Sequence, residues 1–340
     1  MRIFITQPVA QSAIARLREI GEVDVNPNPL HIPSKEELLA AVHDHDILFC
    51  LLHDRIDRDI IAANPRLRMV ASMTITPADI DTKEASARRI PVTVIPSALL
   101  NDATADLAWA LIFSAGRRVS EADRLARAGT IPGSQSSYLE AGGVSGKTLG
   151  LIGVGGVGRA VAQRARGFPL RVIYHDPRRL PEEDEKSLNL TWMGFDQLLS
   201  TADFVSLHAN LSPETRHLIG ARELSLMKPT AFLINTSRGP IVDEQALIRA
   251  LTERRIGGAG LDVFEHEPGI DPALLGLSNT VITTHMGSAV RELRERMANV
   301  AVDNIVAVSE GREPPNCWNK EIYALAHLAQ VQHIGATTNR

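Results

Sequence analysis

The sequence predicts an α/β fold with parallel β-sheets, arranged in two domains. Short runs of β-branched residues alternate with helical patterns along almost the whole chain. This alternation is typical of right-handed βαβ units, whose strands lie parallel in one sheet. With 340 residues, the chain is long enough for about two domains, each with a sizeable core of its own.

The amino-terminal part of the chain predicts strands separated by helices. Ile14, Leu17 and Ile20 share one face of a helix that follows the first strand. Ser34 and Glu37 have the spacing of a capping box, which opens a second helix. We expect strands at 3–5, 47–51, 68–71 and 91–95.

The rest of the chain repeats this pattern after one long helix. That helix is expected at 101–127, and a segment rich in Gly, Ser and Pro from 129 to 146 then predicts a linker or surface loop. The acidic run Glu182–Glu185 predicts a solvated loop. We expect strands at 148–152, 171–174, 204–207, 231–234 and 281–283.

Composition and charge restrict the classes of function. The chain has 36 Lys and Arg residues against 40 Asp and Glu residues, and its net charge of −4 argues against nucleic-acid and anionic-membrane partners. Residues 1–6 predict a strand rather than a signal peptide, and the longest apolar stretch, 107–116, is too short to span a bilayer. The two cysteines, Cys50 and Cys317, indicate a reducing compartment. We therefore expect a cytoplasmic protein with neither nucleic acid nor membrane as partner.

A glycine-rich segment indicates a dinucleotide site. The segment Gly153-Val-Gly-Gly-Val-Gly158 directly follows the strand that ends at Ile152, and it opens a helix. Gly153 would make the turn, Gly155 would let the backbone approach a pyrophosphate, and Gly158 would let helix and strand pack closely. The amino terminus of the helix offers free N–H groups and a partial positive charge to that pyrophosphate. The segment therefore predicts a Rossmann-like domain.

Asp176, at the end of the next predicted strand, bears on the choice of cofactor. Its carboxylate would accept hydrogen bonds from the adenosine ribose and would repel a 2′-phosphate, which favours NAD over NADP. Arg178 and Arg179 follow closely, however, and arginines near this position are what an NADP site uses. Enzymes that bind S-adenosylmethionine share a glycine-rich first turn and remain an alternative at this point.

Three further segments narrow the function: Asn235–Asp243, Gly260–Pro268 and Thr284–Ala289. Together with the glycine-rich segment they resemble the signatures of the D-isomer-specific 2-hydroxyacid dehydrogenases. The segments Cys50–Asp57 and Asp102–Ala108 are most similar to the glyoxylate and hydroxypyruvate reductase branch of that family. The resemblance covers nearly the whole chain, and it implies NAD-dependent interconversion of a 2-oxo acid and a D-2-hydroxy acid.

The resemblance implies a catalytic set of Arg238, Glu267 and His285. A planar guanidinium pairs in a bidentate manner with a carboxylate, so Arg238 suits the binding of the substrate's carboxylate and carbonyl oxygen. A histidine titrates near neutral pH, which suits His285 to proton transfer. Glu267 would pair with the imidazolium and fix the ring. We choose it over Glu265 because the family's acid immediately precedes the proline.

The family also implies where substrate and cofactor bind. The substrate is a small anionic molecule, and the residues expected to contact it are His53, Ile75, Thr76 and Arg238. The residues expected to bind NAD are Thr104, Gly153, Gly155, Gly156, Val157, Gly158, Asp176, Ala209, Thr236, Asp262 and Gly287. We expect no metal site, since the run His43–Asp46 ends a helix without a partner cluster.

The substrate loop departs from the family's pattern. Thr76 stands where a glycine is usual and Pro77 where an aromatic residue is usual, so the loop is more rigid and the pocket more restricted. Asn210 replaces a usual proline. His53 replaces a small polar residue and could bind the far end of a substrate, although a loop histidine in water is an equally good interpretation. We therefore expect a polar or anionic 2-oxo acid other than plain glyoxylate.

The family's architecture implies a discontinuous substrate domain. This domain, 1–99 and 291–340, would surround an NAD-binding domain of 100–290, with the site in the cleft between them. The resemblance also implies a homodimer joined through the NAD-binding domains, for which Trp109 and Phe113 of the long helix look exposed. The carboxy-terminal tail has the spacing of a weak amphipathic helix at Ile322, Leu325, Leu328 and Val331.

Two other functions stay open. Residues 287–291 and Arg294 are similar to the phosphite dehydrogenase version of the histidine motif, but Ile75 stands where that branch carries a lysine. A dinucleotide-sensing protein like the family's transcriptional corepressors is the second alternative. The complete catalytic set favours turnover over sensing.

Overall fold

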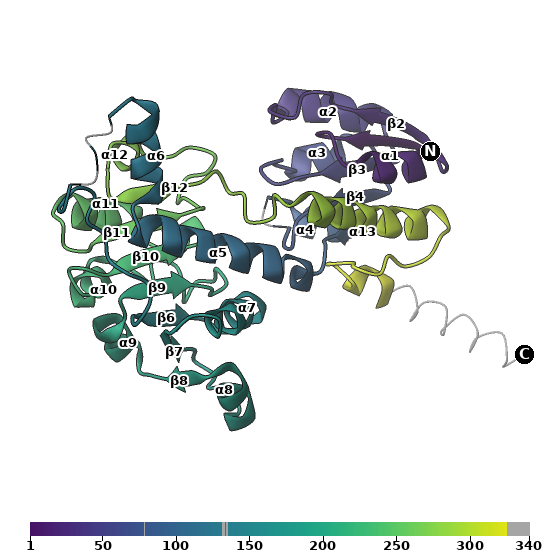
Figure 1. Ribbon diagram of the computed structural model, residues 1–340. Helices are drawn as coiled ribbons and strands as arrows, with labels where there is room; N and C mark the ends of the chain where they lie inside the picture. The colour runs from purple at the N-terminus through teal and green to yellow at the C-terminus, as the bar shows by residue number, and fades with distance from the viewer. Residues whose placement is uncertain (78, 131–132, 134, 325–340) are drawn as a thin grey trace, which may run out of the picture. The chain divides into compact units, whose positions relative to one another are not determined.

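The structure is a computed structural model that describes residues 1–77, 79–130, 133 and 135–324. The chain divides into two compact units (Figure 1): unit 1 holds Met1–Leu99 and the chain from Val290 onward, and unit 2 holds Leu100–Ala289. Each unit contains one parallel β-sheet, which confirms the predicted fold class. The predicted tail positions Leu325, Leu328 and Val331 lie outside the described residues.

Unit 1 is built on a five-stranded sheet that is buried on both faces. In the third strand along the chain, Ile47 and Phe49 pack into one core cluster whereas Leu48 and Cys50 pack into the other. Burial of both faces explains why this strand is a continuous apolar run. The spatial order is β2 (Glu22–Val25), β1 (Arg2–Ile5), β3 (Ile47–Cys50), β4 (Met69–Ser72) and β5 (Val92–Thr93).

The helices of unit 1 connect these strands, and one helix returns from the far end of the chain. The predicted capping box is confirmed, because Ser34 Oγ accepts a hydrogen bond from Glu37 N at 3.2 Å and the Glu37 carboxylate accepts one from Ser34 N at 2.7 Å. The returning helix packs on the first one, where Ser12 Oγ donates to Glu295 at 2.6 Å. The helices are α1 (Gln11–Arg18), α2 (Lys35–Asp44), α3 (Arg58–Ala62), α4 (Thr82–Ala87) and α13 (Arg291–Ser309).

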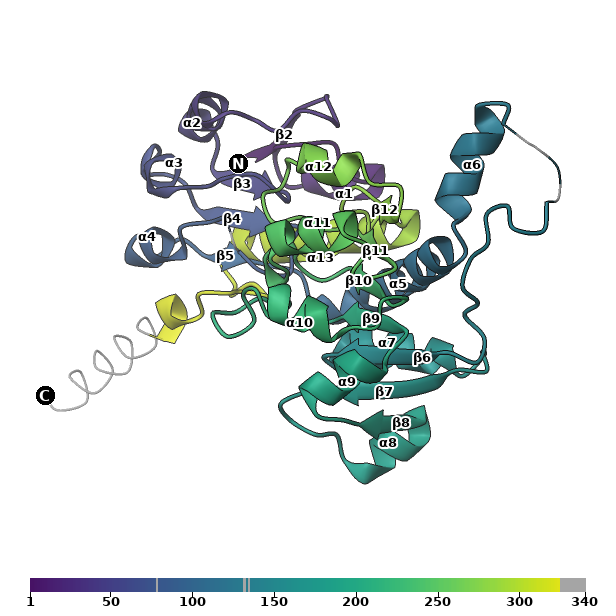
Figure 2. The ribbon, with the colours of Figure 1, turned by 90° about the vertical axis from the view of Figure 1, so that its left-hand side faces the viewer.

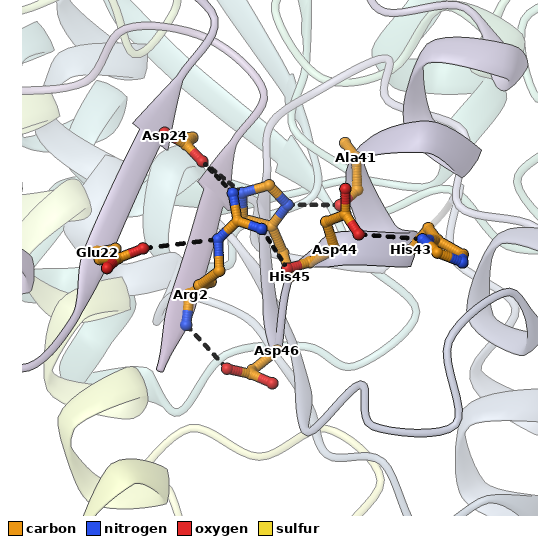
Figure 3. A network of polar contacts seen from close by, with 8 residues as sticks. All are labelled: Arg2, Glu22, Asp24, Ala41, His43, Asp44, His45 and Asp46. Carbon is orange, nitrogen blue, oxygen red and sulfur yellow. Dashed lines mark hydrogen bonds and ion pairs between the residues drawn. The ribbon is translucent and has the colours of Figure 1, made fainter.

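A polar network joins the end of α2 to β1 and β2 (Figure 3). His45 is 6% exposed, and its Nδ1 lies 2.5 Å from Ala41 O while its Nε2 lies 2.8 Å from Asp24 Oδ2. The backbone oxygen and the carboxylate are both hydrogen-bond acceptors. Arg2 also pairs with Asp24, at 3.1 Å. Both ring nitrogens of His45 are therefore engaged inside unit 1.

Unit 2 is built on a seven-stranded sheet whose chain order reverses at β6. The next two strands along the chain lie on one side of β6, and the four after them lie on its other side. Sheets of this kind bind ligands at the carboxyl ends of the strands where the order reverses. The spatial order is β12 (Thr280–Ile282), β11 (Gly258–Leu261), β10 (Phe232–Asn235), β9 (Phe204–Leu207), β6 (Thr148–Ile152), β7 (Arg171–His175) and β8 (Leu190–Trp192).

Helices cover both faces of this sheet, with a separate apolar core on each. The face with α5 (Asn101–Gly116) and α7 (Gly156–Ala165) also carries α8 (Glu182–Leu188) at its edge. The other face is covered by α9 (Phe195–Thr201), α10 (Ala221–Leu226), α11 (Glu244–Thr252) and α12 (Pro272–Leu275). Figure 2 shows α6 (Val119–Arg127) standing away from the sheet, and this helix has no buried residue.

Two expectations about the helix at 101–127 were wrong. The chain breaks into α5 and α6 because Arg118 adopts a left-handed conformation, with φ of 54°. Trp109 is buried rather than exposed: its side chain packs 5.0 Å from the Phe168 ring, and its Nε1 donates to Val161 O at 3.1 Å. Phe113, which is half-buried, joins the same aromatic cluster. Trp109 is thus a core residue of its own unit.

The acidic run and three strands also differ from expectation. Glu182–Glu185 is not a loop but the start of α8, and Glu185 is buried. The strands β2, β8 and β11 were not expected from the sequence. The sequence of β11 contains Gly258 and Gly260, which weaken the strand pattern. A Cβ at Gly260 would lie 3.0 Å from Leu111 Cβ, so the glycine lets α5 pack closely on the sheet.

No helix within the described part of the chain combines the length and the apolar character that crossing a membrane requires.

Candidate active site

The glycine-rich loop lies between β6 and α7, where the strand order reverses. Gly153 has φ of +89°, and a Cβ there would lie 2.8 Å from Ala209 N. A Cβ at Gly158 would lie 2.2 Å from Gly153 O, so both positions require glycine. A Cβ at Gly155, in contrast, would meet no atom within 4 Å. The backbone at Gly155, the residue that caps α7, is therefore open to a ligand.

Three other predicted residues lie at this loop. Gly156 packs against α5, since a Cβ there would lie 2.4 Å from the side chain of Asn101. Val157 is the next residue of α7 and packs against the core on that face. Asp176 follows β7, and its Oδ2 accepts a hydrogen bond from Val154 N at 3.1 Å. The carboxylate therefore joins the end of β7 to the glycine-rich loop.

Two buried polar atoms near the carboxyl ends of β9 and β10 have no hydrogen-bond partner among the described residues: His208 Nδ1 and Thr236 Oγ1. Thr236 is 7% exposed, and an unpaired buried hydroxyl costs free energy unless a ligand pairs with it. Burial lowers the pKa of His208 to about 4, so its ring is neutral, and its Nε2 lies 2.9 Å from Ser206 Oγ. These atoms and the open glycine backbone fit a bound dinucleotide. The sequence had not singled out His208.

Asp262, at the end of β11, holds the loop that carries His285. Its Oδ1 accepts hydrogen bonds from Met286 N at 2.8 Å and from Thr283 Oγ1 at 2.6 Å, and its Oδ2 accepts one from Gly287 N at 2.9 Å. Asp262 is 1% exposed, so this carboxylate is an internal clamp. Thr104 of α5 joins the group, since a Cβ at Gly287 would lie 3.5 Å from its Oγ1.

His285 and Glu267 form a direct pair. His285 Nδ1 lies 2.6 Å from Glu267 Oε2, while Glu267 Oε1 accepts a hydrogen bond from Phe264 N at 2.9 Å. A carboxylate only accepts, so Nδ1 carries a proton, and Nε2 is the nitrogen whose proton can be exchanged. His285 has φ of 52°, a conformation that the Asp262 clamp maintains through His285 N and Asp262 O at 2.9 Å.

Arg238 lies in a turn that Asn235 organises. Asn235 is 1% exposed, and its side chain accepts from Ser237 N at 3.0 Å and donates to Arg238 O at 3.0 Å. Ser237 Oγ donates to Ala209 O, which joins this turn to the end of β9. Burial lowers the pKa of Arg238, but a guanidinium titrates so far above neutral pH that it stays charged.

The loops that carry Arg238 and Glu267 lie backbone against backbone. A Cβ at Gly239 would lie 1.8 Å from Phe264 O, so only glycine permits this approach. Unit 2 therefore brings together the three predicted catalytic residues on neighbouring loops that follow β10, β11 and β12. An anion-binding cation and a proton donor paired with a carboxylate suit the reduction of a 2-oxo acid.

Comparison with known proteins identifies the family. Residues 109–287 match the family described as D-isomer specific 2-hydroxyacid dehydrogenase, NAD binding domain. The chain is 41% identical to a glyoxylate reductase of Thermococcus litoralis, over 94% of this chain and 97% of that protein. The chain belongs to the D-isomer-specific 2-hydroxyacid dehydrogenases. It is an oxidoreductase that interconverts 2-oxo and D-2-hydroxy acids with a nicotinamide dinucleotide, in the glyoxylate and hydroxypyruvate reductase branch.

Two solved structures place this dehydrogenase among its relatives. A protein of Thermus thermophilus has a TM-score of 0.85 and 41% identity, and the match covers 94% of this chain and 100% of that one. An NADPH-dependent glyoxylate/hydroxypyruvate reductase of Sinorhizobium meliloti has a TM-score of 0.79 and 28% identity, with 93% and 97% covered. These comparisons favour neither phosphite oxidation nor corepressor function.

The remaining predicted residues of the dehydrogenase lie in unit 1. His53 follows β3 and has φ of 74°. Ile75 is half-buried and Thr76 is exposed, in the segment after β4. Thr74 Oγ1 donates to Thr76 O at 2.7 Å and so fixes the backbone at the position where the family usually has glycine.

Proposed function

We propose that this dehydrogenase reduces a polar 2-oxo acid to the D-2-hydroxy acid, with NADH as the reductant. The observation that carries the proposal is the 2.6 Å contact between His285 Nδ1 and Glu267 Oε2. It supports a ring that holds a proton on each nitrogen and gives the one on Nε2 to the substrate's carbonyl oxygen. The reduced nicotinamide, when bound, supplies the hydride to the carbonyl carbon.

Arg238 binds the carboxylate and the carbonyl oxygen of the substrate. Its guanidinium is largely desolvated, which strengthens its attraction for an anion and for the negative charge that develops on the carbonyl oxygen. Once His285 has given its proton, Glu267 remains hydrogen-bonded to Nδ1 and keeps the ring in place. The proton is recovered from water after the product leaves.

NAD is the proposed cofactor, and eleven residues of unit 2 are proposed to bind it. The open backbone at Gly155 and the unpaired Thr236 hydroxyl support a pyrophosphate and a ribose or nicotinamide group in this region. Asp176 supports NAD over NADP by charge. The full set is Thr104, Gly153, Gly155, Gly156, Val157, Gly158, Asp176, Ala209, Thr236, Asp262 and Gly287. Calorimetric titration should show NADH binding about tenfold or more tightly than NADPH; tighter NADPH binding would contradict the proposal.

His53, Ile75 and Thr76 are proposed to contact the part of the substrate beyond the carbonyl. Thr76 and the buried Pro77 restrict the loop where relatives have a glycine, which favours a substrate with its own hydrogen-bonding group over plain glyoxylate. The assay follows NADH absorbance with hydroxypyruvate, glyoxylate, bulkier 2-oxo acids and, in the oxidative direction with NAD, phosphite. We expect the highest kcat/KM with hydroxypyruvate or a larger polar 2-oxo acid, and a loss of that preference in His53→Ala. Turnover of phosphite alone would overturn the proposed reaction.

We also propose a cytoplasmic homodimer. The nine-residue helix α6 buries no residue in its own unit, and Val119 at its start is 52% exposed. So short a helix is marginal in water unless its apolar side is packed, which supports contact with a second copy. Cys50 and Cys317 are both free and buried, as suits a reducing compartment. Light scattering after size-exclusion chromatography should give twice the chain's mass of 37.0 kDa.

A further inference from the structure

Arg179, the second arginine after Asp176, is held by a buried carboxylate. Its Nε and Nη2 donate to the two oxygens of Glu185 at 2.9 and 3.0 Å, which is a bidentate pair. Glu185, on α8, is 8% exposed, whereas the other two glutamates of this acidic run are exposed. Glu185 is therefore fixed within unit 2, and the long side chain of Arg179 folds back onto it.

The carboxylate of Glu185 is fixed from a second direction. Tyr174 OH donates to Glu185 Oε1 at 2.5 Å and itself accepts from Leu180 N at 2.9 Å. Hydrogen bonds from Arg179 and Tyr174 lower the pKa of Glu185 to about 2, and burial together with Glu185 raises the pKa of Tyr174 to about 12. The acid is thus ionised and the phenol neutral at every physiological pH.

The ring of Trp192, on β8, supports the guanidinium in this position. The Cζ atom of Arg179 lies 5.9 Å from the centre of the Trp192 ring, within the range of a cation–π contact. Within unit 2, two N–H donors of Arg179 are therefore bound by Glu185, and one face of its guanidinium lies against Trp192. A guanidinium held in this way presents fewer free N–H groups to any further anion.

This arrangement bears on the cofactor because of where Arg179 stands in the chain. In a dinucleotide-binding unit, the acid that ends the second strand binds the ribose 2′-hydroxyl, and an arginine close by is what accommodates a 2′-phosphate. Arg178 and Arg179 both follow Asp176 closely, and Arg179, three residues on, is the one that Glu185 holds. Glu185 already neutralises it.

We infer that Glu185 is a specificity-determining residue: by holding Arg179 in a bidentate pair supported by Tyr174 and Trp192, it removes one of the two arginines, Arg178 and Arg179, that a 2′-phosphate could recruit. The inference rests on the proposed NAD site. Preference for NAD then has two parts, the repulsion of the phosphate by Asp176 and the sequestration of Arg179 by Glu185. Glu185 acts through Arg179 and contacts no cofactor itself.

The test is the ratio of the Kd for NADP to the Kd for NAD, measured by calorimetry on the full chain. Glu185→Gln keeps the shape of the side chain and removes its charge, so Arg179 is released and the ratio should fall by about tenfold. The double variant Glu185→Gln with Arg179→Ala should return the ratio to the wild-type value. If Glu185→Gln only disturbed the fold, the binding of both cofactors would weaken equally and the ratio would not change.

Glu182→Gln is the matched control, since Glu182 lies on the same helix and pairs at the surface with Lys186 at 2.6 Å. It removes the same charge without touching Arg179, so the ratio should not change. A Glu182→Gln effect as large as that of Glu185→Gln would overturn the inference in favour of general electrostatics. If Glu185→Gln does not fold, Arg179→Ala provides the test by itself. A lower NADP affinity than in the wild type would show that Arg179 already binds the 2′-phosphate in the wild type, which would overturn the inference.

The outcomes also separate this inference from the proposed function. A wild-type preference for NADP would overturn both the proposed cofactor and the inference. A wild-type preference for NAD that Glu185→Gln leaves unchanged would overturn the inference alone.

Discussion

Glu244 and Glu265 each accept a hydrogen bond from the backbone nitrogen of the other. Glu265 N lies 3.0 Å from Glu244 Oε2, and Glu244 N lies 3.3 Å from Glu265 Oε2. His217 Nε2 donates to Glu265 Oε1 at 2.6 Å. The pair joins the start of α11 to the segment that leads into Glu267, and it therefore fixes the backbone beside the partner of His285.

The first prediction concerns the loss of this reciprocal pair. Glu244→Ala should lower the free energy of unfolding by about 1–3 kcal/mol, because the partly buried Glu265 N–H loses its acceptor. Glu244→Gln keeps an acceptor oxygen and should cost much less. Glu253→Ala, at the exposed far end of the same helix, is the control and should be nearly neutral. Urea unfolding measures all three, and equal costs for the alanine variants would contradict the role of the pair.

The pH dependence of stability gives a second test of Glu244. Burial raises the pKa of Glu244, so the folded chain holds this proton more tightly than the unfolded chain does. Stability from this group is therefore present at low pH and is lost as pH rises from the unfolded value through the raised one. The difference in stability between wild type and Glu244→Gln should shift in favour of the variant across that window. A difference that is independent of pH would contradict it.

The catalytic pair predicts separable effects on turnover. His285→Ala should lower kcat by roughly two to four orders of magnitude while NADH binding stays close to normal. Glu267→Gln should instead lower kcat less, because the ring keeps a hydrogen-bond acceptor at Nδ1 but loses its anionic partner. His266→Ala, whose side chain is exposed, is the control and should leave kcat unchanged. Near-normal activity of His285→Ala would remove the proposed proton donor.

The approach of two loops at Gly239 predicts a steric effect. Gly239→Ala would place a Cβ 1.8 Å from Phe264 O, so the loops must separate, at a cost of about 1–3 kcal/mol or more. Because these loops carry Arg238 and Glu267, kcat/KM should fall as well. Gly194→Ala is the control, since a Cβ there meets no atom within 4 Å. Thermal unfolding and steady-state kinetics measure the two effects, and a stable, active Gly239→Ala protein would contradict the close approach.

The network around His45 predicts a loss of stability in acid. A hydrogen bond from His45, with a further contribution from Arg2, holds the pKa of Asp24 below its usual value. This stabilisation is present above a pH of about 4 and is lost as pH falls through the lowered pKa. Asp24 is 56% exposed, so after solvent screening Asp24→Asn should cost only about 1 kcal/mol near neutral pH. Asp44→Asn, which removes the surface contact with His43, should have no measurable effect.

Local sequence patterns were sufficient to predict the layers of the fold and the positions of most strands. Parallel strands buried on both faces need continuous apolar runs, and the turn at Gly153 needs a residue without a side chain; both requirements are visible in short segments. Strand β2 escaped prediction because half of its residues are acidic, β8 because it has only three residues, and β11 because it is rich in glycine. Their place in the sheets depends on neighbouring strands rather than on their own composition.

Long-range packing decided the rest. The family motif selected Glu267 over Glu265, but the two are equivalent as isolated carboxylates. The physical reason lies in the fold, which pairs Glu265 with His217 and Glu267 with His285. The position of Trp109 in the helical pattern suggested an exposed side chain, yet Phe168 and α7 cover it. The acidic run beginning at Glu182 looks uniformly solvated, but α8 turns Glu185 inward onto Tyr174 and Arg179. The partners of a side chain come from residues that are distant in the chain. The burial and the charge of those partners determine which acid pairs with the catalytic histidine, which acid holds a loop in place and which acid binds an arginine.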